Sequence, residues 1–291
     1  MAMESLACLN GDLMPVDQAR VPVDDRGFLF GDAVYEVIRL YGGCCWLEAE
    51  HMERLRRGIA ALEFGTYDIG GLTQRMHRTI AASGIQEGTV YLHITRGVSP
   101  RAHAFPKPQV PPTELILVRP YDDTSAARLR EVGVATITQP DLRWKRCDIK
   151  STNLLGNVLA KEAASRAGCH EAVLVDSEGK VTEGSSTSVL WVRGGRLEGT
   201  PEGPGLLPGT TRHLVLRLAE AIGIPYADAR ISLEELLRAD EVLLAGTATE
   251  IVSVVRVDAN PIADGRPGPL ARRIQDAYRE AVANWLAPQT V

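Results

Sequence analysis

Apolar and polar residues alternate in several short segments of the first 120 residues, which predicts an antiparallel β-sheet. The runs LACL and LMPV flank Asn10 and Gly11, a pair that suits a type I′ turn, so the chain should open with a hairpin. Three longer strands are expected further along, at residues 33–41 (AVYEVIRLY), 89–95 (TVYLHIT) and 113–118 (TELILV). Gly42 and Gly43 should turn the first of these strands.

One helical pattern and one proline-rich loop complete this region. Residues 48–64 predict a helix whose apolar face consists of Met52, Leu55, Ile59 and Leu62. Residues 96–112 (RGVSPRAHAFPKPQVPP) contain five prolines, which prevent regular strand pairing. We expect a stiff, exposed loop there, and such loops are suited to ligand contacts.

After Pro120 the polar, turn-prone segment YDDTSA predicts a domain boundary. The chain is therefore divided into an N-terminal domain (residues 1–120), a linker (121–125) and a C-terminal domain (126–291). The last of these alternates strands (VGVATIT, EAVLVD, SVLWV, EVLLAG, EIVSVVRV) with helices that begin near Leu155, Thr210 and Pro269. This mixture predicts an α+β protein of two domains, with a ligand site in the cleft between them.

Composition narrows the class of protein. The net charge is only −5 and the 32 Lys and Arg residues are scattered, so no nucleic-acid partner is expected. No segment approaches the roughly 18 apolar residues of a membrane span, and the N-terminus has no basic start, so we expect a soluble, cytoplasmic protein without a membrane partner. Five cysteines without a CxxC pair favour reduced thiols, and Cys147 is expected to be a buried filler.

Several enzyme motifs are missing from the chain. There is no GxSxG, HExxH or Walker lysine motif, and the six histidines show no metal-ligand spacing, so no metal is expected. Gly203, Gly205 and Gly209 only loosely imitate a dinucleotide-binding loop, because prolines interrupt them and no strand leads in. The remaining polar residues suit pyridoxal phosphate, which needs a lysine for its aldehyde, a carboxylate for its ring nitrogen and an anion site for its phosphate.

Lys150 is the best candidate for the lysine, in the stretch DLRWKRCDIKSTNLLGNVLAKEAA. It is expected between a strand-like end and a buried helix start, where desolvation and the neighbouring Arg146 would lower its pKa. Lys161 should face water on the far side of that helix from Leu155 and Leu159, and Lys145 has no apolar enclosure. A surface lysine at a helix start remains the alternative for Lys150.

Glu183, before Gly184 and a run of hydroxyl residues, is the candidate for the ring nitrogen, although an ordinary turn acid fits equally. Thr210 and Thr211 open a predicted helix, whose free N–H groups and positive dipole end would attract a phosphate. Residues 246–249 could close that site. Simple N-capping by Thr210 is the competing explanation.

Six ordered segments of the chain resemble the class IV pyridoxal-phosphate aminotransferases, and most closely the D-amino acid (D-alanine) aminotransferases. They are DRGFLFGDAVYEV, EHMERL, YLHITRGVSPRAHAFP, RWKRCDIKSTNLLGNVLAKEA, VTEGSSTSV and LPGTTR. The resemblance implies the two-domain fold of type IV, with a smaller N-terminal α/β sandwich and a larger C-terminal α/β pseudo-barrel. It places the cofactor in the cleft between them.

The resemblance also implies a role for individual residues. Lys150 would be bonded to the cofactor, Glu183 would contact its ring nitrogen, and the phosphate would be bound by Arg54, Thr211 and Thr247. Arg101 and His103, with Tyr35, would trap the α-carboxylate of the substrate. In relatives this loop comes from the partner subunit, which implies a homodimer. Lys145 and Pro208 depart from the family pattern. These departures affect the expected details of phosphate and substrate contacts, and not the core chemistry.

The expected activity is ping-pong transfer of an amino group from a D-amino acid such as D-alanine to a 2-oxo acid such as 2-oxoglutarate. Within the same fold, a branched-chain L-aminotransferase, an aminodeoxychorismate lyase and an (R)-amine transaminase would all keep Lys150. The first two should lack the arrangement of Arg101 and His103, and the third should lack a carboxylate trap. A non-catalytic pyridoxal-phosphate carrier is the alternative from a different class.

Overall fold

The computed structural model describes residues 5–287, and it confirms an α+β protein. The chain forms two compact units. The first contains the chain up to Asp122 and, in addition, Ile149–Asn153; the second contains Asp123–Asp148 and the chain from Leu154 onward. The sequence had placed all of residues 126–291 in one domain, so the short segment that carries Lys150 differs from that expectation.

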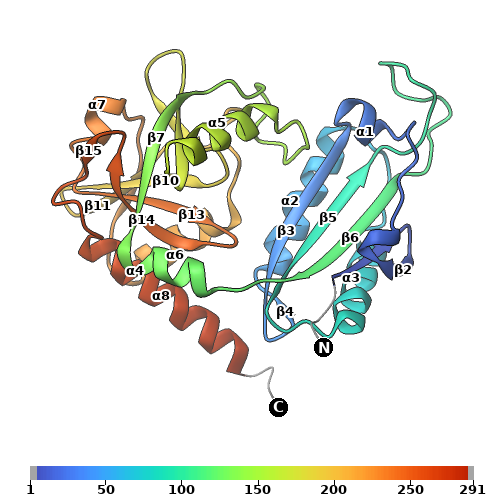
Figure 1. Cartoon of the computed structure of the whole chain (residues 1–291), viewed down its shortest axis with the longest axis horizontal. Helices are drawn as coiled ribbons and strands as arrows, with labels where there is room; N and C mark the ends of the chain where they lie inside the picture. Colours follow the sequence, from blue (N-terminus) through green and yellow to red (C-terminus); the bar gives the residue numbers. More distant parts are fainter. Residues whose placement is uncertain (1–4, 288–291) are drawn as a thin grey trace. The chain divides into compact units, whose positions relative to one another are not determined.

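The first unit is built on a six-stranded antiparallel sheet (Figure 1). Its strands, in spatial order, are β2 (Asp12–Pro15), β1 (Leu6–Leu9), β6 (Thr113–Pro120), β5 (Gly88–Thr95), β3 (Ala33–Tyr41) and β4 (Cys44–Cys45). The hairpin predicted around Asn10 and Gly11 is confirmed, and both residues have the positive φ (51° and 97°) that a type I′ turn requires.

Two helices, α2 (Glu48–Ala61) and α3 (Ile69–Ser83), cover one face of this sheet. Met52, Leu55 and Ile59 of α2 enter the core, as predicted. Sequence analysis did not predict α3, although Leu72, Met76 and Ile80 recur in it at a spacing of four and are buried. The short η1 (Val16–Gln18) and α1 (Arg26–Phe30) lie in the connection between β2 and β3.

The segment Ile149–Asn153 joins the first unit because it runs beside β3. The backbone N–H of Tyr35 donates to the carbonyl of Lys150 (2.9 Å), and Val34 forms an antiparallel bridge with Ser151. Ile149 is buried in the same core. These contacts fix the backbone of Lys150 against a central strand.

The second unit contains a nine-stranded mixed sheet and five helices among its described residues. The strands are β7 (Val134–Pro140), β8 (Glu171–Val175), β9 (Val181–Gly184), β10 (Ser188–Arg193), β11 (Arg196–Gly199), β12 (Tyr226–Asp228), β13 (Glu241–Gly246), β14 (Glu250–Val257) and β15 (Asn260–Pro261). The helices are α4 (Thr124–Val132), α5 (Leu155–Arg166), α6 (Thr210–Ala221), α7 (Leu233–Leu236) and α8 (Pro269–Leu286).

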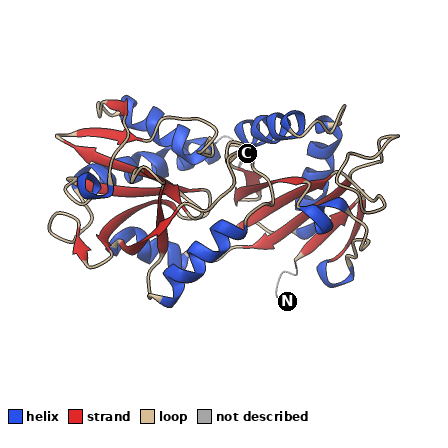
Figure 2. Cartoon of the chain, turned by 90° about the horizontal axis from the view of Figure 1, so that it is seen from above, coloured by secondary structure: helices blue, strands red, loops and turns tan. Residues whose placement is uncertain are grey.

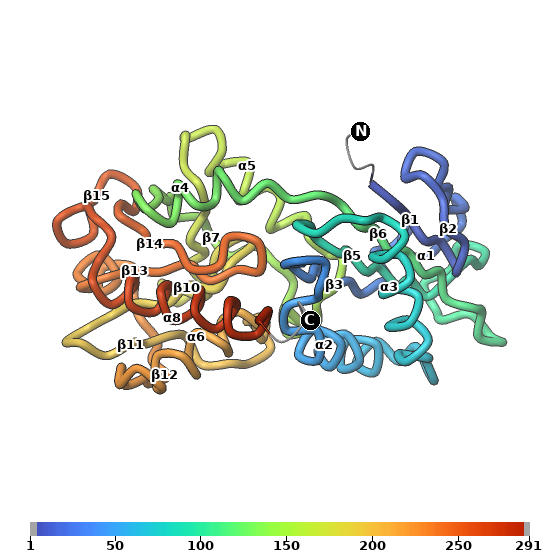
Figure 3. Tube along the Cα trace, turned by 90° about the horizontal axis from the view of Figure 1, so that it is seen from below, coloured from blue at the N-terminus to red at the C-terminus, as the bar shows by residue number. Residues whose placement is uncertain are grey.

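The strand order of this sheet makes it barrel-like. Its path runs β12-β11-β10-β13-β14-β7-β8-β9, yet only three residues connect β9 to β10. Because β9 is five strands away from β10 along the path, the sheet has to curve round to bring them together. Helices α6 and α8 pack on each other and on β13 (Figure 3), and helices flank the strands of each unit (Figure 2). None of the described helices has the length and hydrophobicity that a membrane span requires.

Helix α5 begins at Leu155, as predicted, but its start is not buried. Leu155, Val158 and Leu159 are 72%, 57% and 58% exposed. The inward face consists instead of Ala160 and Ala164, which pack on β8. Small residues allow the helix to approach the strand closely, so the larger side chains point outward. We call Leu155, Val158 and Leu159 the apolar face of α5.

Candidate active site

Lys150 is half-buried in the first unit, over the aromatic ring of Tyr35. Its Nζ lies 4.3 Å from the ring centroid, within the range of a cation–π contact. Arg146, which was expected to lower the pKa of Lys150, instead forms an ion pair with Asp148 (2.9 Å), so its charge is neutralised locally. Of the two rival lysines, Lys145 is exposed and Lys161 Nζ donates to a backbone carbonyl.

Arg54 belongs to a buried ion cluster with Glu36 and His51. Arg54 Nε and Nη2 donate to the two carboxylate oxygens of Glu36, each at 2.7 Å, and His51 Nδ1 lies 2.7 Å from Glu36 Oε2. Burial alone would raise the pKa of Glu36, but the charge and hydrogen bonds of Arg54 and His51 outweigh it and lower the pKa to about 2. Burial lowers the pKa of His51, and the charge of Lys150 adds to that effect, which places this cluster near the lysine.

This cluster predicts a specific acid sensitivity. Because the pKa of Glu36 falls from 4.5 to about 2 on folding, its ionised form stabilises the fold fully above pH 4.5, and this stabilisation is lost as the pH falls towards 2. The full contribution is roughly 3 kcal/mol. The free energy of unfolding, measured with urea at pH 7 and at several values from pH 4 downward, should therefore fall more steeply with acidity in the wild type than in Glu36→Gln.

Glu53→Gln is the matched control, because Glu53 lies next to Arg54 on α2 but pairs with Arg56 at the surface. It should keep the wild-type pH dependence. Equal loss of stability in acid for the wild type and Glu36→Gln would contradict the assignment to Glu36.

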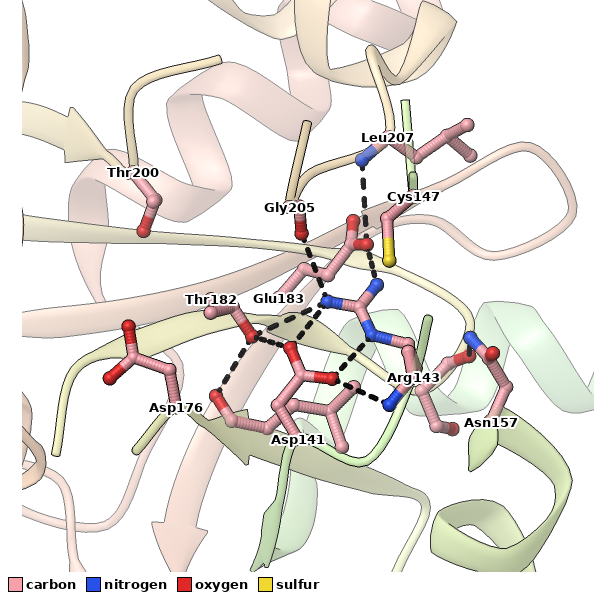
Figure 4. Close-up of polar contacts among 12 residues, drawn as sticks. Asp141, Arg143, Cys147, Asn157, Asp176, Thr182, Glu183, Thr200, Gly205 and Leu207 are labelled. Atoms are coloured by element: carbon pink, nitrogen blue, oxygen red, sulfur yellow. Dashed lines mark hydrogen bonds and ion pairs between the residues drawn. The ribbon is translucent and has the colours of Figure 1, made fainter. Parts of the chain in front are cut away.

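Glu183 lies one residue before the end of β9 in the second unit and is 5% exposed. Arg143 Nη1 donates to Glu183 Oε1 (Figure 4). The same guanidinium is held by Asp141, with Nε–Oδ1 at 2.9 Å and Nη2–Oδ2 at 2.7 Å, and it donates to the carbonyl of Gly205. Thr182 Oγ1 donates to Asp141 at 2.7 Å, so the acid behind the arginine is also fixed.

The charge of Arg143 acts on the pKa of both carboxyl groups that it contacts. Burial raises the pKa of Glu183, and the guanidinium of Arg143 opposes that effect. Burial also acts to raise the pKa of Asp141, but hydrogen bonds from Arg143 and Thr182 outweigh it and lower the pKa. Arg143 therefore lies between two carboxyl groups and favours the ionised form of each. Cys147, close to this network, is buried as predicted, and burial raises its pKa to about 11.

The N-terminus of α6 lies next to Glu183. Thr210 and Thr211 are both 4% exposed, and the N-cap is Gly209, without a side-chain cap, so capping by Thr210 does not explain its position. Leu207, just before the helix, donates its N–H to Glu183 Oε1 (3.4 Å). A helix N-terminus attracts anions, and Leu207 joins this one to the carboxylate of Glu183.

The turn between β13 and β14 carries Thr247. Ser188 connects this turn to the helix end, because it pairs with Ala245 at the end of β13 and its Oγ lies 2.8 Å from a Cβ built on Gly209. The residue after the turn, Glu250, has a φ of +60° and accepts a hydrogen bond from Gln275 of α8 (2.6 Å). The structure thus gathers Glu183, Thr210, Thr211 and Thr247 in the second unit.

The loop of residues 96–112 carries Arg101 and His103, both exposed. The guanidinium carbon of Arg101 lies 5.3 Å from the ring centroid of Phe30, and the ring of His103 lies 5.5 Å from it. The side chains of Arg101 and His103 therefore both lie beside the ring of Phe30. It belongs to the first unit, together with Lys150, Tyr35 and Arg54.

Comparison with known proteins identifies the family. A family model described as class IV amino-transferase matches residues 33–257. The chain belongs to the class IV aminotransferases. It is 37% identical over 279 residues to the D-alanine aminotransferase of Staphylococcus haemolyticus, covering 94% of this chain and 96% of that protein. It is 36% identical over 277 residues to that of Bacillus licheniformis, covering 94% and 95%.

Solved structures of branched-chain amino acid aminotransferases resemble this aminotransferase closely. That of Escherichia coli has a TM-score of 0.89 at 27% identity, covering 95% of this chain and 94% of that chain. That of T.th., solved with pyridoxamine 5′-phosphate, has the same TM-score and identity, covering 96% and 94%. The two-domain fold of type IV that the sequence predicted is thereby confirmed.

The residues present fit the pyridoxal phosphate that class IV aminotransferases use. The chain offers a half-buried lysine, a buried carboxylate held by an arginine, and a buried helix N-terminus that carries two threonines. Sequence analysis missed the supporting groups Arg143, Asp141, Glu36 and His51. A signal for Glu36 was present: it shares the inward parity of Val34 and Ile38 on a strand, where an acid is unexpected.

Proposed function

We propose that this transaminase is a D-amino acid aminotransferase, which transfers the amino group of a D-amino acid such as D-alanine to a 2-oxo acid such as 2-oxoglutarate. The observation that carries the proposal is the similarity of 36–37% identity to D-alanine aminotransferases over 94% of the chain. The exposed pair Arg101 and His103 supports it, because a guanidinium can bind a carboxylate through two parallel hydrogen bonds. A cytoplasmic location stays a prediction.

Each proposed site residue has a chemical task. When bound, pyridoxal phosphate withdraws electrons from the Cα of the substrate and so makes its proton acidic. Lys150 Nζ would remove that proton from Cα as a general base and then, as a general acid, would donate it to C4′ of the cofactor. Arg143 favours the ionised form of Glu183 and holds its carboxylate in place. Glu183 would hold a proton on the cofactor ring nitrogen, which would stabilise the negative charge that develops there.

Binding of the phosphate and of the substrate falls to other groups. The first-turn N–H groups of α6 at Thr210 and Thr211 would bind the phosphate, and the family resemblance adds Thr247 and Arg54 to this set. Glu36 and His51 fix the direction of the Arg54 guanidinium. Arg101, His103 and Tyr35 bind the α-carboxylate of the substrate and so orient its Cα–H bond.

One assay tests reaction class and handedness together. Purified holoenzyme is mixed with 2-oxoglutarate and either D-alanine or L-alanine, and pyruvate is measured. Pyruvate from D-alanine only is expected. Faster turnover of L-leucine would favour a branched-chain L-aminotransferase, and faster turnover of (R)-1-phenylethylamine an amine transaminase. Exchange of the α-proton of D-alanine in deuterated water would exclude a mere cofactor carrier, and its absence would support one.

The proposal includes a homodimer in which the loop with Arg101 and His103 serves the site of the partner. The apolar face of α5 supports an interface, because three large apolar side chains lie exposed there, with Leu142 (71% exposed) on the loop that Gly156 of α5 touches. The double substitution Leu155→Lys and Leu159→Lys should therefore lower the molar mass in light scattering from that of a dimer to that of one chain.

Glu162→Gln is the control for this experiment, because Glu162 is exposed on the same helix and, within the described part of the chain, forms its ion pair with Arg166 of that helix. It should remain dimeric. A dimer that survives both lysines would place the interface elsewhere.

A further inference from the structure

The loop of residues 96–112 begins next to the start of α1, and backbone contacts join the two segments. Arg26 N–H donates to the carbonyl of Gly97 (3.0 Å), and Asp25 forms an antiparallel bridge with Val98. Gly97 has a φ of +102°, and a Cβ there would lie 2.0 Å from the carbonyl oxygen of Pro111, so only glycine fits. The N-terminal end of the loop is therefore fixed to the segment that contains Arg26.

The side chain of Arg26 holds the middle of the loop. It is 3% exposed, and its guanidinium donates to three consecutive carbonyls: Nη1 to Ala102 (2.6 Å) and Ala104 (3.3 Å), and Nη2 to His103 (3.3 Å). These carbonyls belong to the residues that directly follow Arg101. A single planar group with five donors is thus suited to fix this turn of backbone, which an amine could not span.

Asp32 connects Arg26 to a second arginine, Arg96, which contacts Phe105 of the loop. Its Oδ2 accepts from Nε of Arg26 and from Nε of Arg96, both at 2.8 Å. Arg96 in turn lies 3.5 Å from the ring centroid of Phe105 and donates to the carbonyls of residues 62 and 63. One carboxylate oxygen therefore orients two arginines, of which Arg26 holds the backbone of residues 102–104 and Arg96 contacts Phe105.

The ring of Phe30 contacts Arg26 and also the two loop side chains, Arg101 and His103. Its ring centroid lies 4.9 Å from the guanidinium carbon of Arg26, 5.3 Å from that of Arg101 and 5.5 Å from the ring of His103. Arg26 thus determines the backbone of residues 102–104 and contacts the same ring on which both side chains rest. None of these contacts involves a residue that reacts.

We propose that Arg26 is a positioning residue for recognition of the substrate carboxylate, acting through the backbone of residues 102–104. The inference rests on the proposed function, in which Arg101 and His103 bind that carboxylate. With Arg26 in place, the loop is ordered before the substrate arrives, so binding does not have to supply the ordering free energy. Without it, carboxylates bind more weakly, while the groups that move protons are untouched.

The test compares Arg26→Gln with the wild-type holoenzyme in steady-state kinetics with D-alanine. We expect KM to rise about tenfold and kcat to change less than about threefold. The inhibition constant of propionate, a carboxylate without an amino group, should rise by the same factor as KM. The dissociation constant of pyridoxal phosphate should stay at the wild-type value, because Arg26 is assigned no cofactor contact.

Two further variants make the result decisive. Arg20→Gln is the control, because Arg20 is exposed and donates only to the carbonyls of Asp17 and Ala19 among the described contacts; it should match the wild type. Arg26→Lys retains the charge beside Asp32 but cannot reach three carbonyls, so it should show an intermediate rise in KM. If Arg26→Gln does not fold, this variant carries the test.

The outcomes separate the two proposals. If Arg101→Gln weakens binding of D-alanine and propionate but neither Arg26 variant does, the assignment of Arg26 is wrong and the proposed function stands. A fall in kcat at unchanged KM in the Arg26 variants also overturns the assignment. If the wild-type enzyme does not transaminate D-amino acids, the proposed function fails and the inference falls with it.

Discussion

Lys150→Ala should abolish transamination between D-alanine and 2-oxoglutarate, with a loss of at least about 10²–10⁴ in kcat, because a positioned general base contributes that much. Lys150 is held by the backbone of β3 and lies over the ring of Tyr35, so alanine removes the amine without removing a core side chain. The fold should therefore persist, as circular dichroism can show. Pyruvate formation measures the loss.

Lys161→Ala is the control for this loss, because Lys161 was one of the two rival candidates and its side chain is 45% exposed. It should retain wild-type turnover. Borohydride reduction followed by peptide mapping adds an independent readout, since the cofactor should be found on the peptide that contains Lys150. Near-normal turnover of Lys150→Ala, or a label on another peptide, would exclude Lys150 as the reacting lysine.

Glu183→Gln should lower kcat about 10²–10³-fold, the usual cost of removing one group that stabilises developing charge. Glutamine has nearly the same size and still accepts hydrogen bonds from Arg143 and Leu207, but it has no charge to keep a ring nitrogen protonated. KM for D-alanine should change much less than kcat. Absorbance titration of the bound cofactor should also show a shift in its pH dependence.

Glu178→Gln provides the comparison for a surface acid, because Glu178 is 69% exposed and lies in the turn between β8 and β9. It should leave kcat unchanged. A Glu183→Gln enzyme with wild-type kcat would show that no charge is needed at this position, and the role assigned to Glu183 would be wrong.

The sequence predicted most strands of both units because alternation and turn residues are local signals. The hairpin at Asn10 and the strand from Ala33 to Tyr41 are examples. The place of Ile149–Asn153 could not be predicted in the same way. It depends on pairing with β3, more than 100 residues earlier in the chain, and nothing in the segment itself indicates that partner.

The predicted orientation of α5 was wrong, because the size of the apolar side chains decides which face of the helix packs inward, and not their hydrophobicity alone. Leu155 and Leu159 are the larger apolar residues, but the close approach to β8 requires the smaller Ala160 and Ala164. A helix with two apolar faces of different size gives no unique answer from its sequence. Which face packs inward depends on the space available beside the strand.

The residues that support the site differ in whether their role could be predicted from the sequence. Glu36 interrupts the inward face of an otherwise apolar strand, so its parity could have revealed it. Arg143 gave no such signal, because its partners Asp141 and Glu183 are separated from each other by 42 positions and meet only when β9 folds beside the 141–147 segment. Chain-distant ion pairs of this kind require the tertiary structure.

The assignment of Ile149–Asn153 to the first unit has a consequence for synthesis of the chain. A nascent polypeptide that ends at residue 122 has all six strands of the first sheet but lacks Ile149, a buried member of that core. The first unit can be completed only after residue 153 has left the ribosome, when part of the second unit has also emerged. A truncated fragment of residues 1–122 should accordingly expose apolar surface and aggregate during expression.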